Sequence, residues 1–141
     1  MTHKRRAIVN AIETQIGNFP GLNTRSSDFY PIEEGLLPMC TILVDSEEIT
    51  EDSVDGRQYR ALAVDVEITV QGGETVPQII DDYCEAVEIQ VMADETLGGL
   101  CIFNKLVTTE INYNAEADKR HANALLSYLV QYETTRTNPS A

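Results

Sequence analysis

The sequence is short of the features that mark many functional classes. Its 141 residues contain no tryptophan and only three cysteines. An odd, widely spaced cysteine set argues against a disulfide framework. No apolar run approaches the roughly 20 residues that span a bilayer. The segment Met1–Arg6 carries three bases, but polar residues interrupt the apolar ones between positions 7 and 16, so no signal peptide is predicted. We expect a cytosolic chain with no membrane partner.

Positive charge is also scarce, because 10 Lys and Arg face 23 Asp and Glu and leave a net charge of −13. Between residues 26 and 104 the only bases are Arg57 and Arg60, against eighteen acids. Binding to a phosphate backbone needs clustered cations, so specific nucleic-acid binding is not expected. The acids form either an ordinary solvated face or a surface that repels polyanions or meets a basic partner. The densest acidic window contains Asp45, Glu47, Glu48, Glu51, Asp52 and Asp55.

Motifs that carry chemistry are missing as well. The sequence has no phosphate-binding lysine loop, no dinucleotide-binding glycine pattern and no zinc-protease or serine-hydrolase motif. His3 and His121 lack the paired spacing of a zinc site. Cys84 falls on the apolar stripe of a predicted helix and is interpreted as a buried structural cysteine. The acidic window lacks the alternating ligands and central glycine of a calcium loop. We expect no catalytic residue, no cofactor, no metal and no enzymatic activity.

Hydrophobic periodicity predicts two helices and four strands. Ile8, Ile12 and Ile16 form one apolar stripe of an N-terminal helix over residues 1–17. Prolines and glycines then favour an extended arm over residues 18–38, and residues 135–141 form a polar tail. Thr75 and Gln78 have the spacing of a capping box. The expected strands are 39–44, 59–71, 106–115 and 122–134, the second helix is 76–92, and the acidic window is expected to form a long hairpin tip.

Two of the expected strands determine the predicted fold. Residues 59–71 alternate with period two, which is typical of a strand with one buried and one wet face. Residues 122–134 are apolar on both faces, which indicates a central strand or one covered by another chain; a helix is the rival interpretation for residues 122–129. The order α-β-β-α-β-β predicts a single α+β domain. Its mostly antiparallel four-stranded sheet, made of two hairpins, has both helices packed on one face.

Taken in this order, the whole chain resembles the tail terminator proteins of long-tailed bacteriophages, the family of the lambda minor tail protein U. The resemblance lies in the N-terminal helix, the crossing arm, a hairpin ending in residues 60–70 (RALAVDVEITV), the mid-chain helix, and closing strands that end in residues 129–135 (LVQYETT). It implies a structural virion protein, located at the neck end of the tail. Such proteins form a hexameric ring that caps the tail tube, ends its polymerisation and joins the tail to the head.

The resemblance also implies partners: further copies of the chain, the tail tube protein and the head–tail connector or stopper protein, with DNA passing through the ring. The candidate subunit or tube contacts are Leu125 and Leu129 on the second face of the last strand, and Phe29 and Tyr30 in the arm. The acidic window is the candidate lumen surface. The alternative interpretation of these features is an ordinary buried strand and ordinary loops. Alternative functions are a head-closure, tail-completion or tail-tube subunit, or a small hydrolase-like or regulatory domain.

Overall fold

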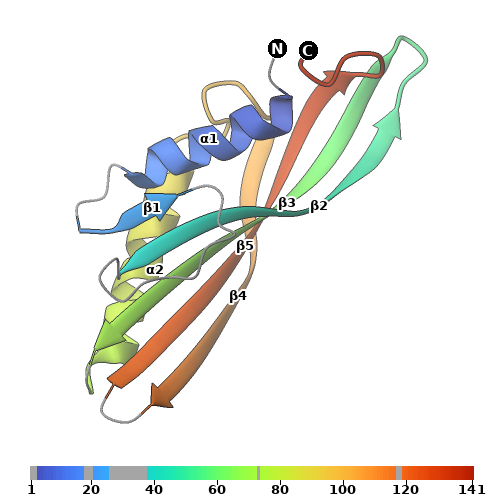
Figure 1. Cartoon of the computed structure of the whole chain (residues 1–141). Helices are drawn as coiled ribbons and strands as arrows, with labels where there is room; N and C mark the ends of the chain where they lie inside the picture. Colours follow the sequence, from blue (N-terminus) through green and yellow to red (C-terminus); the bar gives the residue numbers. More distant parts are fainter. Residues whose placement is uncertain (1–2, 18–20, 26–37, 73, 117–118) are drawn as a thin grey trace.

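One twisted β-sheet with two helices on it makes up the computed structural model, which describes residues 3–17, 21–25, 38–72, 74–116 and 119–141. In chain order the elements are α1 (Lys4–Gly17), β1 (Asn23–Arg25), β2 (Met39–Asp52), β3 (Arg57–Gly72), α2 (Val76–Met92), β4 (Phe103–Glu116) and β5 (Lys119–Thr135). The strands lie in the order β1-β2-β3-β5-β4 (Figure 1).

The predicted four-stranded antiparallel sheet is wrong, because the sheet has five strands and is mixed. The additional strand is β1, and it pairs in parallel with the start of β2, where Asn23 lies opposite Met39. β1 is three residues long and lies within the segment that we expected to be an extended arm. A three-residue strand is too short to show a period of two, which explains why the sequence pattern did not reveal it.

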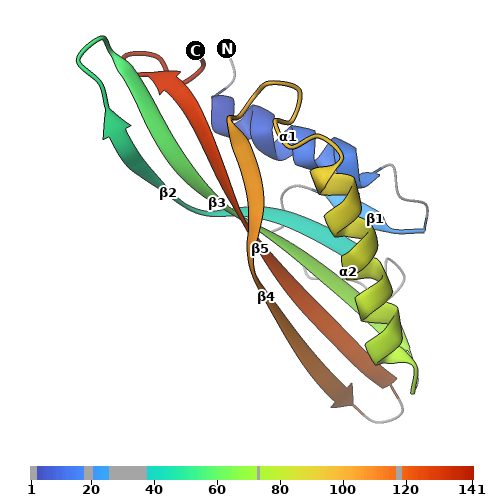
Figure 2. The same ribbon diagram turned by 180° about the vertical axis from the view of Figure 1, so that it is seen from behind.

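The core lies between one face of the sheet and both helices (Figures 1 and 2). Alternate residues of β3 and β5 point to this face and are almost fully buried, and α1 and α2 add their apolar stripes. The resulting layer includes Leu62, Val64, Val66, Ile68, Leu126, Tyr128, Ile12 and Ile80. Cys84 belongs to this core at 6% exposure, so its predicted burial is confirmed. Cys40 and Cys101 are buried as well.

Most of the acidic window belongs to strand β2 and not to a long hairpin tip. β2 continues to Asp52 and pairs with β3 as far as Gln58, so the turn comprises only residues 53–56. The register of β2 shifts at Val44/Ser46 and again at Ile49/Glu51, which marks a β-bulge at each place. Bulges bend a strand and increase its twist. The distal part of the hairpin extends past the helices (Figure 2).

The expected capping box at the start of the second helix is not formed. The helix begins and ends at the predicted residues, Val76 and Met92, but the Thr75 side chain makes no capping hydrogen bond. Pro77 lies in the first turn, where its missing N–H leaves no intrahelical bond unmade. The helix boundary therefore depends on the proline and on packing against the sheet.

We predict that the core, and not the exposed hairpin turn, carries the stability. Leu126→Ala should lower the free energy of unfolding by about 2–5 kcal/mol, because it removes a fully buried side chain and leaves a cavity. Val54→Ala, at a fully exposed turn position, should change it by no more than about 0.5 kcal/mol. Urea unfolding followed by circular dichroism measures both. Equal losses in the two variants would contradict the described core.

Candidate interaction surface

The face of the sheet opposite the helices, here called the open face, combines carboxylates with leucines. The strand register places Glu67 of β3, Leu125 of β5 and Glu110 of β4 in one row across the sheet. A second row holds Ala63, Leu129 and Lys105. Leu125 and Leu129 are half-buried, and neither belongs to the core. The two candidate contact residues that the sequence indicated therefore lie together on a face that neither helix covers.

Partial burial and neighbouring acids both disfavour the negative charge of Asp65 on the open face. Partial burial raises the pKa of the Asp65 carboxyl, and the nearby charges of Asp45, Glu67 and Glu110 raise it further. The hydroxyl of Ser127 opposes this rise by donating a hydrogen bond to Asp65 Oδ1 at 3.1 Å. The charged form of Asp65 is therefore disfavoured in the folded protein.

Three of the six acids of the acidic window have basic or hydroxyl partners within the chain. Glu47 lies on the helix side of β2 and is bound by Arg5 and Arg60 at 2.9 and 3.2 Å. Asp52 pairs with Arg136 at 2.8 Å. Hydrogen bonds from Ser53 and Arg57 hold the pKa of Asp55 well below its usual value.

The remaining members of the window are Asp45, Glu48 and Glu51, which are exposed, as Asp52 and Asp55 are too. Glu48 lies on the open face, in the row of Ala61 and Gln131. The window is therefore not one uniform acidic surface, because ion pairs occupy half of it. The other two candidate contacts, Phe29 and Tyr30, lie outside the described residues.

Two strand edges are a feature that the sequence analysis missed. β4 pairs with β5 on one side, and within the described ranges no strand covers its other side. β1 covers only Met39–Thr41 of β2, and among the described residues no other strand pairs with the rest of that side, so it forms a second edge. Exposed apolar side chains follow the β4 edge: Val107, Ile111 and Tyr113. Uncovered strand edges present backbone N–H and C=O groups that another chain can bind.

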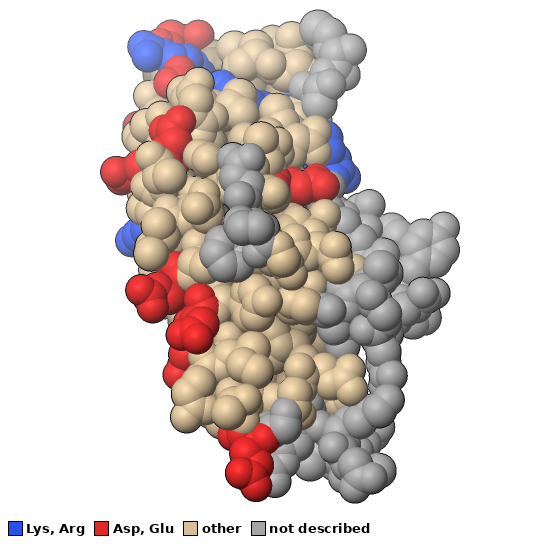
Figure 3. Space-filling model, turned by 90° about the vertical axis from the view of Figure 1, so that its left-hand side faces the viewer, with Lys and Arg blue, Asp and Glu red and all other residues tan. Residues whose placement is uncertain are grey.

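A separate acidic set lies on the outer side of α2, where Asp81, Asp82 and Glu85 are exposed. On the side of the molecule shown in Figure 3, acidic side chains gather mainly along one margin and basic ones are few. Because α2 packs on the opposite face of the sheet, these acids are separate from those of the open face. The chain thus carries two distinct acidic surfaces, one on each side of the sheet.

The three thiols are buried and unreactive in character. Burial raises the pKa of Cys40 to about 12 and those of Cys84 and Cys101 to about 11. Within the described ranges, no group of three or more His, Cys, Asp or Glu residues could hold a metal ion. No helix in that part of the chain is long and apolar enough to cross a membrane.

Comparison with known proteins gives a weak similarity in structure to a virion protein. No protein-family model matches the chain, and no curated protein matches its sequence. The fold is similar to that of a chain in the virion of a native gene transfer agent (GTA) particle. The TM-score is 0.43 and the identity 9%, over 87% of this chain and 93% of that chain. Both values are low, so this similarity carries no argument about function.

We predict that Asp65→Asn stabilises the protein at neutral pH. The pKa of Asp65 is raised in the folded state, so its charge costs stability above that pKa, and the cost disappears as the pH falls and the carboxyl is protonated. The gain should be below about 1 kcal/mol, because the site is partly solvated. Unfolding free energies at pH 7 and pH 3 measure it. A variant less stable than the parent at pH 7, or equally improved at both values, would contradict the described repulsion.

Proposed function

We propose that this chain is a structural protein of a phage-type virion, without catalytic activity, that assembles into a closed ring at the end of a tail tube. The observation that carries the proposal is the direction of the sheet edges. The long strands β2, β3, β5 and β4 alternate in direction across the sheet. The two edge strands β2 and β4 are therefore antiparallel to each other. The β4 edge of one copy can thus pair with the β2 edge of an identical copy as antiparallel strands, and the open faces of both copies then lie on the same side of the joined sheet.

Such a joint is heterologous, because the β4 edge of one copy meets the β2 edge of the next. Heterologous contacts generate a ring when the rotation between copies closes, and an open filament when it does not. Opposite charges on the two edges support this pairing. Lys105 of β4 and Glu48 of β2 are exposed on the open face in neighbouring rows, Lys105 in the row of Ala63 and Leu129 and Glu48 in the row of Ala61 and Gln131. The leucine pair of the open face, Leu125 and Leu129, would lie beside this joint.

The acidity of the open face fits a wall along which DNA passes. Six copies with a net charge of −13 carry −78 in total. Negative walls repel phosphate, which prevents DNA from adhering to the channel. In this arrangement Asp65, Glu67 and Glu110 face the channel, and α2 faces outward. The role as a tail terminator, with the tube protein and the head connector as neighbours, follows from the resemblance in layout.

A tail-tube or other neck subunit is the second candidate, because the same edges permit stacked as well as single rings. The two functions differ in what the purified protein forms. A terminator should stop at discrete rings, and a tube subunit should continue into long cylinders.

We predict that the purified protein forms rings of about six copies, alone or with a tail tube protein. Light scattering after size-exclusion chromatography gives the mass, and negative-stain electron microscopy distinguishes rings from cylinders. A Thr109→Pro variant in the β4 edge should lower the ring fraction at least tenfold, because proline disrupts edge pairing. Its control is Val54→Pro in the hairpin turn. A protein that stays monomeric under all these conditions would refute the proposal, and long cylinders would favour the tube subunit.

We also predict that the charge of the open face affects passage of DNA and not assembly. Changing Glu67 and Glu110 to Lys should slow genome ejection in reconstituted particles several-fold, because the channel would then attract phosphate. The matched control changes Asp82 and Glu85 to Lys on the outer side of α2, with the same charge difference. Ejection can be followed by release of dye-bound DNA, and rings by microscopy. Equal ejection rates in both double variants would count against a channel role for the open face.

A further inference from the structure

A compact ionic cluster lies where the distal hairpin meets the first turn of α1. Its centre is Glu47 on β2. The carboxylate oxygen Oε2 accepts hydrogen bonds from Arg5 Nη1 at 2.9 Å and from Arg60 Nη1 at 3.2 Å. The other oxygen, Oε1, accepts a hydrogen bond from the hydroxyl of Tyr132. One carboxylate therefore binds three side chains from three different elements, α1, β3 and β5.

Most of the cluster is withdrawn from water. The side chains of Glu47 and Arg60 are 12% and 14% exposed and Tyr132 is fully buried, whereas Arg5 is 39% exposed. In such surroundings an ion pair is screened much less than on the surface. Arg60 has one further bond, from Nε to the side-chain oxygen of Gln58 at 3.0 Å. Removal of the Glu47 charge would thus leave two guanidinium groups close together with no carboxylate between them.

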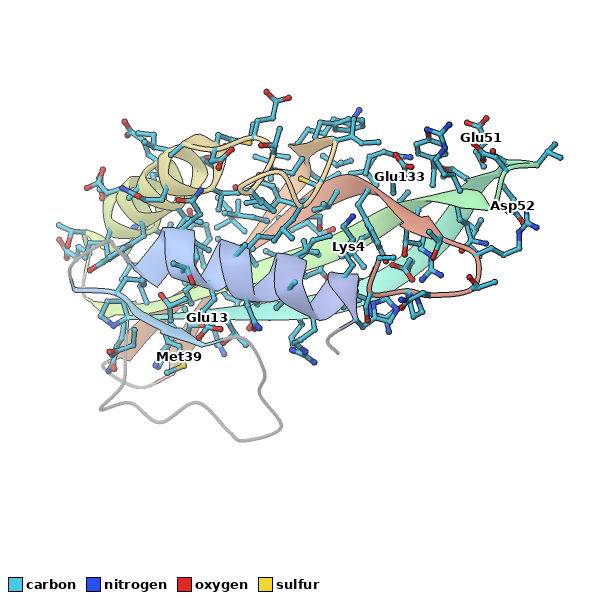
Figure 4. The ribbon with its side chains drawn as sticks, turned by 90° about the horizontal axis from the view of Figure 1, so that it is seen from above. Lys4, Glu13, Met39, Glu51, Asp52 and Glu133 are labelled. Atoms are coloured by element: carbon cyan, nitrogen blue, oxygen red, sulfur yellow. The ribbon has the colours of Figure 1, made fainter. Side chains whose placement is uncertain are left out.

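Further bonds connect the same first turn of α1 to the end of the sheet. Lys4 Nζ donates to the carbonyl oxygen of Glu133 at 2.8 Å, and the backbone N–H of Lys4 donates to the carbonyl oxygen of Pro139 at 2.9 Å. Figure 4 shows Lys4 and Glu133 together, with Glu51 and Asp52 farther out on the hairpin. The first turn of α1 thus touches β2 and β5 and the C-terminal turn at one place.

The two bulges of β2 bracket Glu47. One lies between Val44 and Ser46 and the other between Ile49 and Glu51, so the strand is irregular on both sides of the cluster. A strand interrupted twice can change direction more readily than a regular one. Beyond the second bulge, Arg136 closes the hairpin turn through Asp52 Oδ1 and through its own N–H to the carbonyl oxygen of Gly56, both at 2.8 Å. These bonds connect the end of the hairpin to the C-terminal turn.

We propose that Glu47 is a lock that fixes the distal hairpin, residues 46–60, to the first turn of α1. Loss of its negative charge releases the two segments from each other and leaves the rest of the sheet, including residues 64–70 and 122–128, folded. Repulsion between the freed Arg5 and Arg60 drives the separation, and β2 bends at its bulges. Residues 132–135 of β5, which pair with residues 57–60 of β3, separate from α1 together with the hairpin. The lock belongs to the single chain, so it holds whether or not the chain forms rings.

Hydrogen exchange measured by mass spectrometry on the full chain tests the lock with Glu47→Gln, which keeps the shape and removes the charge. Exchange should rise at least tenfold in residues 4–8 and 46–60 and stay unchanged in residues 64–70 and 122–128. Glu48→Gln is the matched control, since Glu48 is the neighbouring acid, exposed on the other face of the same strand. It should leave every segment as in the parent.

Tyr132→Phe is a second, milder variant, because it removes one hydroxyl and keeps the buried ring. It should raise exchange in the same two segments by a smaller factor, and it decides the question if Glu47→Gln does not fold. Unchanged exchange in either segment would overturn the lock. So would an equal rise in all strands, which would make Glu47 a general stability residue.

Discussion

The uninterrupted pairing of β3 with β5 is the constraint on which the remaining structure depends. It runs from Arg57 opposite Thr135 to Gly72 opposite Arg120 without a register shift. Because side chains alternate strictly along both strands, one face of this pair is apolar from Leu62 to Val70 of β3 and from Ala122 to Tyr132 of β5, and the other face is mixed. The helices cover the apolar face, and β2 and β4 extend the pair on either side. The open face and the two free edges are direct results of this arrangement.

The sequence revealed those parts of the fold that have a regular pattern over many residues. β3 and β5 were identified because their alternation spans more than ten residues, and α2 because its apolar stripe has helical spacing. The outer half of β2 was missed, because its side chains apart from Glu47 are exposed on both faces and two bulges interrupt the period of two. It is a strand only because β3 pairs with it, and the sequence pattern does not show pairing between distant residues.

The candidate surface was predictable to a similar extent. Leucines at odd positions of β5 indicated a second apolar face, which a central position in the sheet or another chain would cover. Leu125 and Leu129 do lie on the open face. Glu110 beside Leu125 follows only from the β4–β5 register. The partners of Glu47 are 42, 13 and 85 positions away in the sequence, so no local pattern relates them. In the sequence, Glu47 is one of several similar acids in the acidic window, and only the fold shows that it is shielded from water and paired with two arginines.

The burial of all three cysteines has a practical consequence. Their thiols are shielded and remain protonated at neutral pH, so maleimide reagents should leave them unmodified in the folded protein. A single cysteine introduced at an exposed position would then be the sole reactive group on the molecule. Fluorophores or spin labels placed in this way could report distances between the hairpin, the helices and neighbouring copies without removal of any native cysteine.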